Sequence, residues 1–227
     1  CAAGHLFATE NNPNNDNKFM EENLNLIQEW DKTFPQSDKV NHKKITFHNR
    51  YGITLAADLY VPKNVTGKLP AIAISGPFGA VKEQASGLYA QTLAERGFLT
   101  IAFDPSYTGE SSGQPRYVAS PDINTENFSA AVDYLSTRDD VDAERIGILG
   151  ICGWGGMALN AAAIDTRIKA TVTATMYDMS RVNANGYFDS MNADARHELR
   201  RQLNAQRTED YRNGTFALGG GVVDPLP

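Results

Sequence analysis

The chain has 227 residues, 41% hydrophobic and 21% charged, which is typical of a globular protein that buries one sizeable core. Its 27 acidic residues outnumber the 21 basic ones, and the net charge of −6 argues against a nucleic-acid or anionic-lipid partner. No apolar run reaches the ~18 to 20 residues of a membrane-spanning helix, and the two cysteines, Cys1 and Cys152, suggest neither a disulfide framework nor a metal site, so we expect no membrane span, metal or cofactor.

Residues 1–18 predict a tether or a processed N-terminal segment. They begin "CAAGHLFATENNPNNDN", without methionine and with an Asn-rich stretch, a composition that does not support a packed core. Three origins fit a terminal cysteine: a mature lipoprotein whose Cys1 carried lipid, the remnant of a signal peptide, or an expression scar. A processed N-terminus would mean a periplasmic or lipid-anchored protein, and otherwise the protein would be cytoplasmic.

A short helix and a pair of strands are expected next. Within residues 19–30, apolar side chains recur at helical spacing from Met20 to Trp30, which predicts an amphipathic helix. Segments 43–49 and 53–62 are short, rich in branched and aromatic residues, and separated by turn residues. They predict two antiparallel strands.

From residue 71 onward, predicted strands alternate with predicted helices. Strands are expected over 71–75, 98–103, 145–150 and 169–176, and helices over 82–96, 125–136 and 155–163. This order, with strands that are apolar almost throughout, is typical of a parallel sheet covered by helices on both faces. Because ligands bind at the carboxyl ends of such strands, one rim should gather residues 75–80, 104–111, 150–156 and 177–180.

Residues 192–214 predict one long helix. Asn192 can cap its start, and Asn213 with Gly214 can end it. Its five arginines, together with Leu199 and Leu203, indicate an amphipathic face in solvent. The glycine-rich segment that follows predicts a flexible connection.

The sequence "GICGWGG", residues 150–156, carries the candidate chemistry. It follows a predicted strand and precedes a predicted helix, which is the strand-turn-helix context of a nucleophile elbow. At such a turn the nucleophile projects into the site, and the next backbone N–H and the helix N-terminus stabilise negative charge. Cys152 is the candidate nucleophile, and the other interpretation is a small buried structural cysteine.

Family resemblance covers about residues 43–178. The run "RIGILGICGWGGMALNAAAID" resembles the elbow of alpha/beta-hydrolases, and its cysteine resembles the dienelactone-hydrolase branch. "NRYGITLAADLYVP" is similar to the opening strands of X-prolyl dipeptidyl peptidase and acyl-esterase relatives, "ISGPFGAVKEQ" stands where their oxyanion loop is, and "FDPSYTGESSG" resembles their Asp-x-x-x-x-Gly-x-Ser turn. The resemblance implies an α/β class, an alpha/beta-hydrolase fold with a mostly parallel sheet and helices on both faces, lacking its last strands in this chain.

Two departures from the family pattern matter. Trp154 stands two positions after Cys152, where the family has a small residue, and a register with the nucleophile position at Trp154 would mean a lost or different activity. A cysteine nucleophile also needs a base, usually a histidine oriented by a carboxylate. None of the histidines is expected to reach the elbow: His5, His42, His48 and His197. The resemblance implies a base after the last strand, so we expect a C-terminal remainder of the same protein to supply it.

The resemblance also implies roles for individual residues. The N–H groups of Gly153 and Phe78 are the expected oxyanion donors. Asp178 is the candidate carboxylate, with a turn or cap role as the alternative. Trp154 and Tyr107 are expected to line the substrate pocket.

Two further pairs of residues are expected to be structural. Asp104 and Ser111 should hold their own turn together. Lys82 and Glu83 should be solvated at the start of a helix. The expected regions are a tether at 1–18, an incomplete alpha/beta-hydrolase core at 19–180, and a cap-like helical insertion with a flexible connection at 181–227.

Three functions remain open. The leading hypothesis is a metal-free hydrolase that acts on a small-molecule ester, thioester or lactone by acyl transfer through Cys152. The second is a non-catalytic homologue in which Trp154 fills the pocket and the rim binds a ligand or partner. The third, suggested by the opening strands, is a serine-peptidase-like acyl hydrolase. The sequence leaves homo-oligomerisation open.

Overall fold

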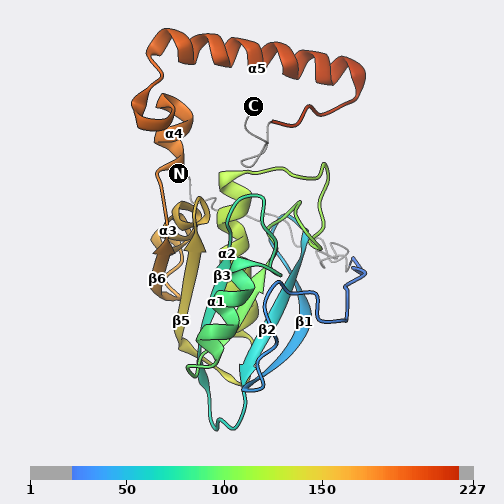
Figure 1. The fold of residues 1–227 in the computed structure, drawn as a ribbon, viewed down its shortest axis with the longest axis vertical. Helices are drawn as coiled ribbons and strands as arrows, with labels where there is room; N and C mark the ends of the chain where they lie inside the picture. The colour runs from blue at the N-terminus through green and yellow to red at the C-terminus, as the bar shows by residue number, and fades with distance from the viewer. Residues whose placement is uncertain (1–21, 220–227) are drawn as a thin grey trace, which may run out of the picture.

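The computed structural model describes residues 22–219, so the predicted tether at 1–18 lies outside the described residues. Six strands form one sheet in the order β1-β2-β4-β3-β5-β6 (Figure 1). The strands are β1 (Val40–His48), β2 (Thr54–Pro62), β3 (Leu69–Ser75), β4 (Leu99–Phe103), β5 (Val141–Ile151) and β6 (Ile168–Ala174). The predicted antiparallel pairing of the first two strands is confirmed, and β2 also pairs antiparallel with β4. The neighbouring pairs of β4, β3, β5 and β6 are parallel, as predicted.

Helices cover both faces of this sheet. They are α1 (Ala85–Ala94), α2 (Pro121–Ser136) and α3 (Trp154–Ile164). One core cluster joins α2 and α3 to one face through residues such as Phe128 and Met157. The other cluster joins α1 to the opposite face through Ala90 and Ala94. Burial on both faces explains why the strands read as apolar runs, and it leaves the carboxyl ends of β3, β4, β5 and β6 at one rim.

Residues 22–39, which we call the N-terminal strap, correct one expectation. Over Glu22–Trp30 the chain is irregular, so the predicted amphipathic helix is wrong for the described part of that segment. The Trp30 ring packs edge-on against Phe34 and His42, at centroid distances of 5.7 and 5.1 Å. The Ile27 N–H donates to a carboxylate oxygen of Glu110, 2.8 Å away. Short isolated helices are only marginally stable in water. The contacts with His42 and Glu110 therefore decide the conformation of this segment.

The long helix α5 (Ala193–Asn213) confirms its prediction at both ends. The Asn192 side chain accepts a hydrogen bond from the Ala195 N–H at 2.9 Å, and Gly214 ends the helix with a left-handed φ of 64°. The preceding segment forms α4 (Met179–Asn185) and the short η1 (Tyr187–Asp189). No residue of α4, η1 or α5 is buried, and α5 extends beyond the rim (Figure 1). Its role as a cap stays a prediction.

Across residues 22–219, the structure has no helix that is both long enough and apolar enough to cross a membrane.

Candidate active site at the rim of the sheet

Cys152 occupies the sharp turn between β5 and α3. Its φ is 58°, a left-handed value that is uncommon for a residue with a side chain and often marks a functional turn. The Cys152 N–H donates to the Ala174 carbonyl at 2.9 Å, and the Cys152 carbonyl accepts from the Gly155 N–H at 3.0 Å. These bonds fix the turn at the end of β6 on one side and at the start of α3 on the other. A strand, a strained turn and a helix in this order are the backbone arrangement that a nucleophile elbow requires.

Close packing explains two of the glycines in this turn. A Cβ on Gly150 would lie 2.8 Å from the Gly155 Cα and closer still to the Trp154 carbonyl oxygen. A Cβ on Gly153 would collide with the Phe78 ring and with the Met179 sulfur. Side chains at either position would therefore push the elbow apart.

Trp154 lies in the core beneath the elbow. Its side chain is 3% exposed, and its ring packs edge-on against Phe78 at a centroid distance of 4.3 Å. On the other side, Gly76 approaches so closely that a Cβ there would be 2.8 Å from the Trp154 Cβ. The bulk that departs from the family pattern is therefore accommodated inside the protein. The expectation that Trp154 lines a substrate pocket stays a prediction.

Two backbone N–H groups at the rim lack a partner. Gly153 precedes the first residue of α3, and Phe78 lies in the segment 76–84 between β3 and α1, which we call the oxyanion loop. Neither N–H has a hydrogen-bond acceptor within residues 22–219. The N-terminus of a helix favours negative charge, so these two N–H groups are candidates to bind an oxyanion.

Tyr177 is a neighbour of the cysteine at the rim, where the strand order had placed residues 177–180 together with 150–156. The Cys152 side chain is partly exposed. Burial raises the pKa of Tyr177, and the charge and hydrogen bond of Cys152 raise it further. The direct contact between these two side chains was not among the roles expected for Tyr177.

Asp178 caps α4 in the structure. Its carboxylate accepts from the Arg181 N–H at 3.0 Å and from the Ser180 hydroxyl at 2.6 Å. These two hydrogen bonds lower the pKa of Asp178, whose side chain is exposed. The cap role was the stated alternative, and the catalytic role stays a prediction.

The described histidines lie away from the elbow. His42 and His48 are on β1, at the opposite edge of the sheet from β5 and β6, where His42 Nε2 is 2.8 Å from the buried Asp58. His197 is exposed on α5. Among residues 22–219, the rim therefore holds the Cys152 side chain and two N–H groups without an acceptor, and no histidine lies beside them.

A groove of about 410 Å³ runs beside the elbow. It is lined by Gly153, Met157, Met176, Tyr177 and Met179, with residues of α3 and α4. Tyr107 lies in the turn after β4, where its N–H donates to the Ser112 carbonyl at 2.9 Å, and its expected place in the substrate pocket stays a prediction. That turn is self-supporting as predicted, since the Ser111 hydroxyl donates to the Asp104 carbonyl at 2.7 Å.

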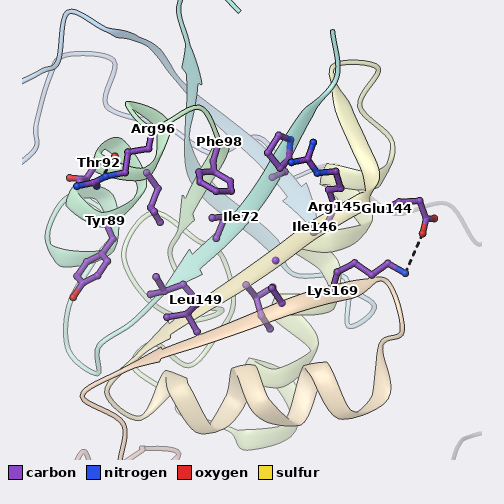
Figure 2. A pocket seen from close by; sticks show the side chains of 17 residues that line it. Ile72, Tyr89, Thr92, Arg96, Phe98, Glu144, Arg145, Ile146, Leu149 and Lys169 are labelled. Carbon is purple, nitrogen blue, oxygen red and sulfur yellow. Dashed lines mark hydrogen bonds and ion pairs between the residues drawn. The ribbon is translucent and has the colours of Figure 1, made fainter. Parts of the chain in front are cut away.

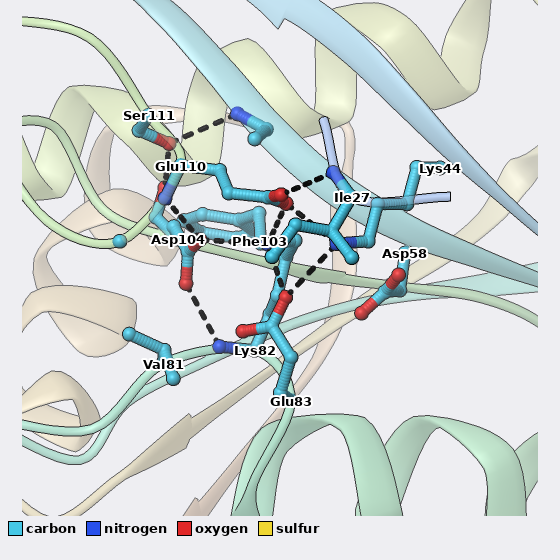
Figure 3. Close-up of polar contacts among 12 residues, drawn as sticks. Ile27, Lys44, Asp58, Val81, Lys82, Glu83, Phe103, Asp104, Glu110 and Ser111 are labelled. Carbon is cyan, nitrogen blue, oxygen red and sulfur yellow. Dashed lines mark hydrogen bonds and ion pairs between the residues drawn. The ribbon is translucent and has the colours of Figure 1, made fainter. Parts of the chain in front are cut away.

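Lys82 is buried, which corrects the expectation that it is solvated. Its side chain has 0% exposure, and its Nζ lies 2.5 Å from Glu83, 2.9 Å from Asp104 and 2.6 Å from Glu110 (Figure 3). Those three carboxylates lie near enough to one another to hold a metal ion, but the Lys82 ammonium fills the position between them. Lys44 joins the same group through Glu83 and Glu110.

A family model and a protein of known structure both match most of this chain. A family model described as "X-Pro dipeptidyl-peptidase (S15 family)" matches residues 51–217. The uncharacterized protein PA2218 of Pseudomonas aeruginosa is 69% identical over 195 residues, which cover 86% of this chain and 53% of that protein. Its crystal structure superposes with a TM-score of 0.85 at 66% identity, covering 88% of this chain and 65% of the other. The chain therefore spans about half the length of the curated relatives it matches.

Two more distant relatives are a hydrolase of known structure and a thiohydrolase. The crystal structure of the alpha/beta hydrolase GrgF from Penicillium superposes with a TM-score of 0.67 at 22% identity, covering 82% of this chain and 60% of the other, and confirms the predicted fold. The thiohydrolase aneE of Aspergillus aculeatus is 28% identical over 137 residues, covering 60% of this chain and 42% of that protein.

Proposed function

We propose, from the premise that this chain belongs to the X-Pro dipeptidyl-peptidase (S15) family of alpha/beta hydrolases, that it carries the nucleophile of an acyl hydrolase. The substrate class is a small-molecule ester, thioester or lactone. The similarity to a thiohydrolase supports the thioester as the first substrate to try. Cys152 is the nucleophile, and the N–H groups of Gly153 and Phe78 are the oxyanion donors.

The observation that carries this proposal is the backbone of Cys152. A φ of 58° at a non-glycine residue is energetically unfavourable. A purely structural cysteine gains nothing from that strain, whereas a nucleophile needs it to stand clear of the sheet at the helix N-terminus.

The reaction that fits these groups is a two-step acyl transfer. The Cys152 thiolate adds to the carbonyl carbon, and the carbonyl oxygen becomes an oxyanion between the Gly153 and Phe78 N–H groups. Collapse of this intermediate breaks the bond to the alcohol or thiol, which leaves with a proton, and forms an acyl-thioester on Cys152. Water then attacks the acyl group, releasing the carboxylic acid and restoring the thiol.

Proton transfer in both steps requires a base within hydrogen-bond reach of Cys152. We propose that the base is a histidine from a C-terminal remainder of the same protein, because the curated relatives are about twice as long as the matched segment. In this proposal residues 19–180 form the core, and residues 181–227 form a cap and a connection to that remainder.

An apolar groove supports the same arrangement. It has a volume of about 560 Å³ and is formed by α1, β3, β5 and β6 (Figure 2). Its floor is lined by residues such as Ile72, Leu149 and Val172. We propose that an apolar helix of the remainder packs into this groove and that a strand pairs with β6, because an exposed edge strand invites pairing.

The other two functions have less support. The non-catalytic alternative relied on Trp154 filling the pocket, whereas the Trp154 ring is buried in the core. The serine-peptidase-like alternative agrees with the family match, but the elbow residue is a cysteine.

The test uses the full-length protein and a panel of acyl thioesters, p-nitrophenyl esters, lactones and X-Pro anilides. We expect turnover of acyl substrates, and a loss of about 10³-fold or more in Cys152→Ala. Iodoacetamide should alkylate Cys152, and turnover should be lost in proportion to the alkylation.

A buried apolar position makes the matched control. Ala158→Ser, in α3 but away from the rim, should leave turnover unchanged. Undiminished turnover in Cys152→Ala would sink the nucleophile assignment, and a preference for X-Pro anilides would favour the peptidase alternative.

A further inference from the structure

Lys82 connects three segments that are distant in the sequence. Its Nζ contacts Asp104 and Glu110 in the turn after β4, and Glu83 beside it (Figure 3). Glu110 in turn accepts from the Ile27 N–H of the N-terminal strap at 2.8 Å. One ammonium therefore joins the oxyanion loop to the turn 104–111, and through Glu110 to the strap.

Asp104 bonds both the backbone N–H and the side-chain ammonium of Lys82. One of its carboxylate oxygens accepts from the Lys82 backbone N–H at 2.8 Å, and the other contacts the Lys82 Nζ at 2.9 Å. That second oxygen also accepts from the Glu110 N–H at 2.9 Å. Asp104 itself is fully buried and bonded through its own N–H to Ala56 on β2 at 2.9 Å. The lysine is therefore attached to the central part of the sheet.

The charge of Lys82 is retained by these contacts. Burial alone would lower the pKa of Lys82, but the charges of Asp104 and Glu83 and the hydrogen bonds that Lys82 donates to Glu110 and Glu83 raise it above its ordinary value. An ammonium has three N–H donors, and here three carboxylates accept them. Removing the charge would leave the buried Asp104 without its ion-pair partner, whereas Glu83 and Glu110 would keep Lys44.

The oxyanion loop is consequently anchored on both sides of Phe78, whose ring also packs against Trp154 at a centroid distance of 4.3 Å. At its start, Gly76 lies against the Ile151 carbonyl and Trp154 of the elbow. At its other side, four residues after Phe78, the backbone and side chain of Lys82 are bonded to Asp104. Between these anchors the loop has few bonds of its own, such as the one from the Ala80 N–H to the Pro77 carbonyl at 3.3 Å.

We propose that Lys82 is a positioning residue that holds the oxyanion loop so that the Phe78 N–H faces a carbonyl at Cys152. This inference rests on the proposed function for its catalytic consequence. An oxyanion donor acts mainly on the transition state, so displacing Phe78 lowers kcat more than it raises KM.

Lys82→Met in the full-length protein tests the role, with Lys32→Met as the matched control. Lys32 Nζ is also at 0% exposure and is paired with Asp31 and Asp58, but it does not touch the oxyanion loop. We expect Lys82→Met to lower kcat on an acyl thioester by about ten-fold or more with KM within about three-fold. Alkylation of Cys152 by iodoacetamide, which forms no oxyanion, should keep its rate within about two-fold.

Amide hydrogen exchange gives a readout that does not depend on turnover. Peptides covering residues 77–82 should exchange about ten-fold faster in Lys82→Met and at the wild-type rate in Lys32→Met. The thermal stability of both variants should fall. If Lys82→Met does not fold, Lys82→Met combined with Glu110→Gln removes one positive and one negative charge together, and the same outcomes are expected.

Two results would overturn the proposal: equal losses of kcat in the Lys82 and Lys32 variants, or unchanged exchange of residues 77–82 in the Lys82 variant. A wild-type protein that turns over no acyl substrate would instead count against the proposed function. The exchange measurement would still decide whether Lys82 holds the loop.

Discussion

At the scale of single residues, the elbow combines backbone strain with close packing. Cys152 has a left-handed φ of 58°, and the residues before and after it are tightly enclosed. Gly150 faces the backbone of Trp154 and Gly155, whereas Gly156 has no atom within 4 Å of the position its Cβ would take. The same cluster therefore contains glycines that packing requires, such as Gly150 and Gly153, and one that it does not, Gly156.

Gly150→Ala should destabilise the protein and disturb the elbow. Its new Cβ would lie 2.8 Å from the Gly155 Cα, and backbone atoms in a turn cannot rotate away as a side chain can. We expect a loss of about 1–3 kcal/mol in unfolding free energy, typical of overpacking, measured by urea denaturation, together with a lower rate of Cys152 alkylation.

Gly156→Ala is the matched control within α3. Because its Cβ would meet open space and alanine favours a helix over glycine, we expect a gain of about 0.5–1 kcal/mol. Equal destabilisation by the two substitutions would contradict the packing argument at Gly150.

At the scale of elements, the N-terminal strap shows how ionic contacts replace a predicted helix. Lys32 Nζ is buried between Asp31, at 2.5 Å, and Asp58, at 3.0 Å. Asp31 also contacts Lys44 on β1 at 2.8 Å. Apolar spacing alone suggested a helix here, because spacing does not register that charged side chains can be drawn into contact with a sheet.

Asp31 should make the stability of this strap depend on pH. Burial alone would raise its pKa, but Lys32 and Lys44 lower it from 3.8 to about 2. A carboxylate with a lowered folded pKa stabilises the fold above its unfolded pKa and loses that contribution as pH falls to the folded pKa. We expect wild type to exceed Asp31→Asn in unfolding free energy by a constant amount above about pH 5, and the difference to vanish between about pH 4 and pH 2.

Asp38→Asn provides the control on the same strap, because the Asp38 side chain is exposed. Urea denaturation at several pH values should give a small difference between Asp38→Asn and wild type. A difference for Asp31→Asn that persists unchanged at pH 2 would show that the ion pair is not its cause.

At the scale of the whole molecule, one face of the sheet carries an uncovered groove. Val172 on the edge strand β6 is 54% exposed within residues 22–219 and lines the apolar groove beside α1. Exposed apolar surface of this kind marks an interaction site or an aggregation liability. The proposed occupant is a helix from the remainder of the longer protein.

Val172→Glu should therefore have opposite effects in two contexts. In the 227-residue chain, an added charge on an exposed edge strand should reduce self-association, measured by light scattering, with little change in unfolding free energy. In the full-length protein the same charge should be buried under the proposed helix and cost about 2 kcal/mol or more.

Leu88→Glu is the control for this comparison. Leu88 is 47% exposed on α1 and lies outside the groove, so its substitution should be tolerated equally in both contexts. Equal tolerance of Val172→Glu in the full-length protein would contradict the proposed packing.

The sequence by itself determined the elements whose signals are local. Apolar runs separated by turn residues predicted all six strands of the described sheet, because this pattern is a local signal. Asn192 and Gly214 predicted both ends of α5, since a cap depends on residues a few positions away. The glycines around Cys152 predicted a tight turn between β5 and α3 for the same reason.

Only the tertiary structure decided where charges and bulky groups are placed. It buried Lys82 between carboxylates up to 28 residues away, and joined Ile27 to Glu110, 83 residues along the chain. It also directed the Trp154 ring into the core. Such contacts depend on which segments the sheet brings together, and neither periodicity nor local spacing encodes that information.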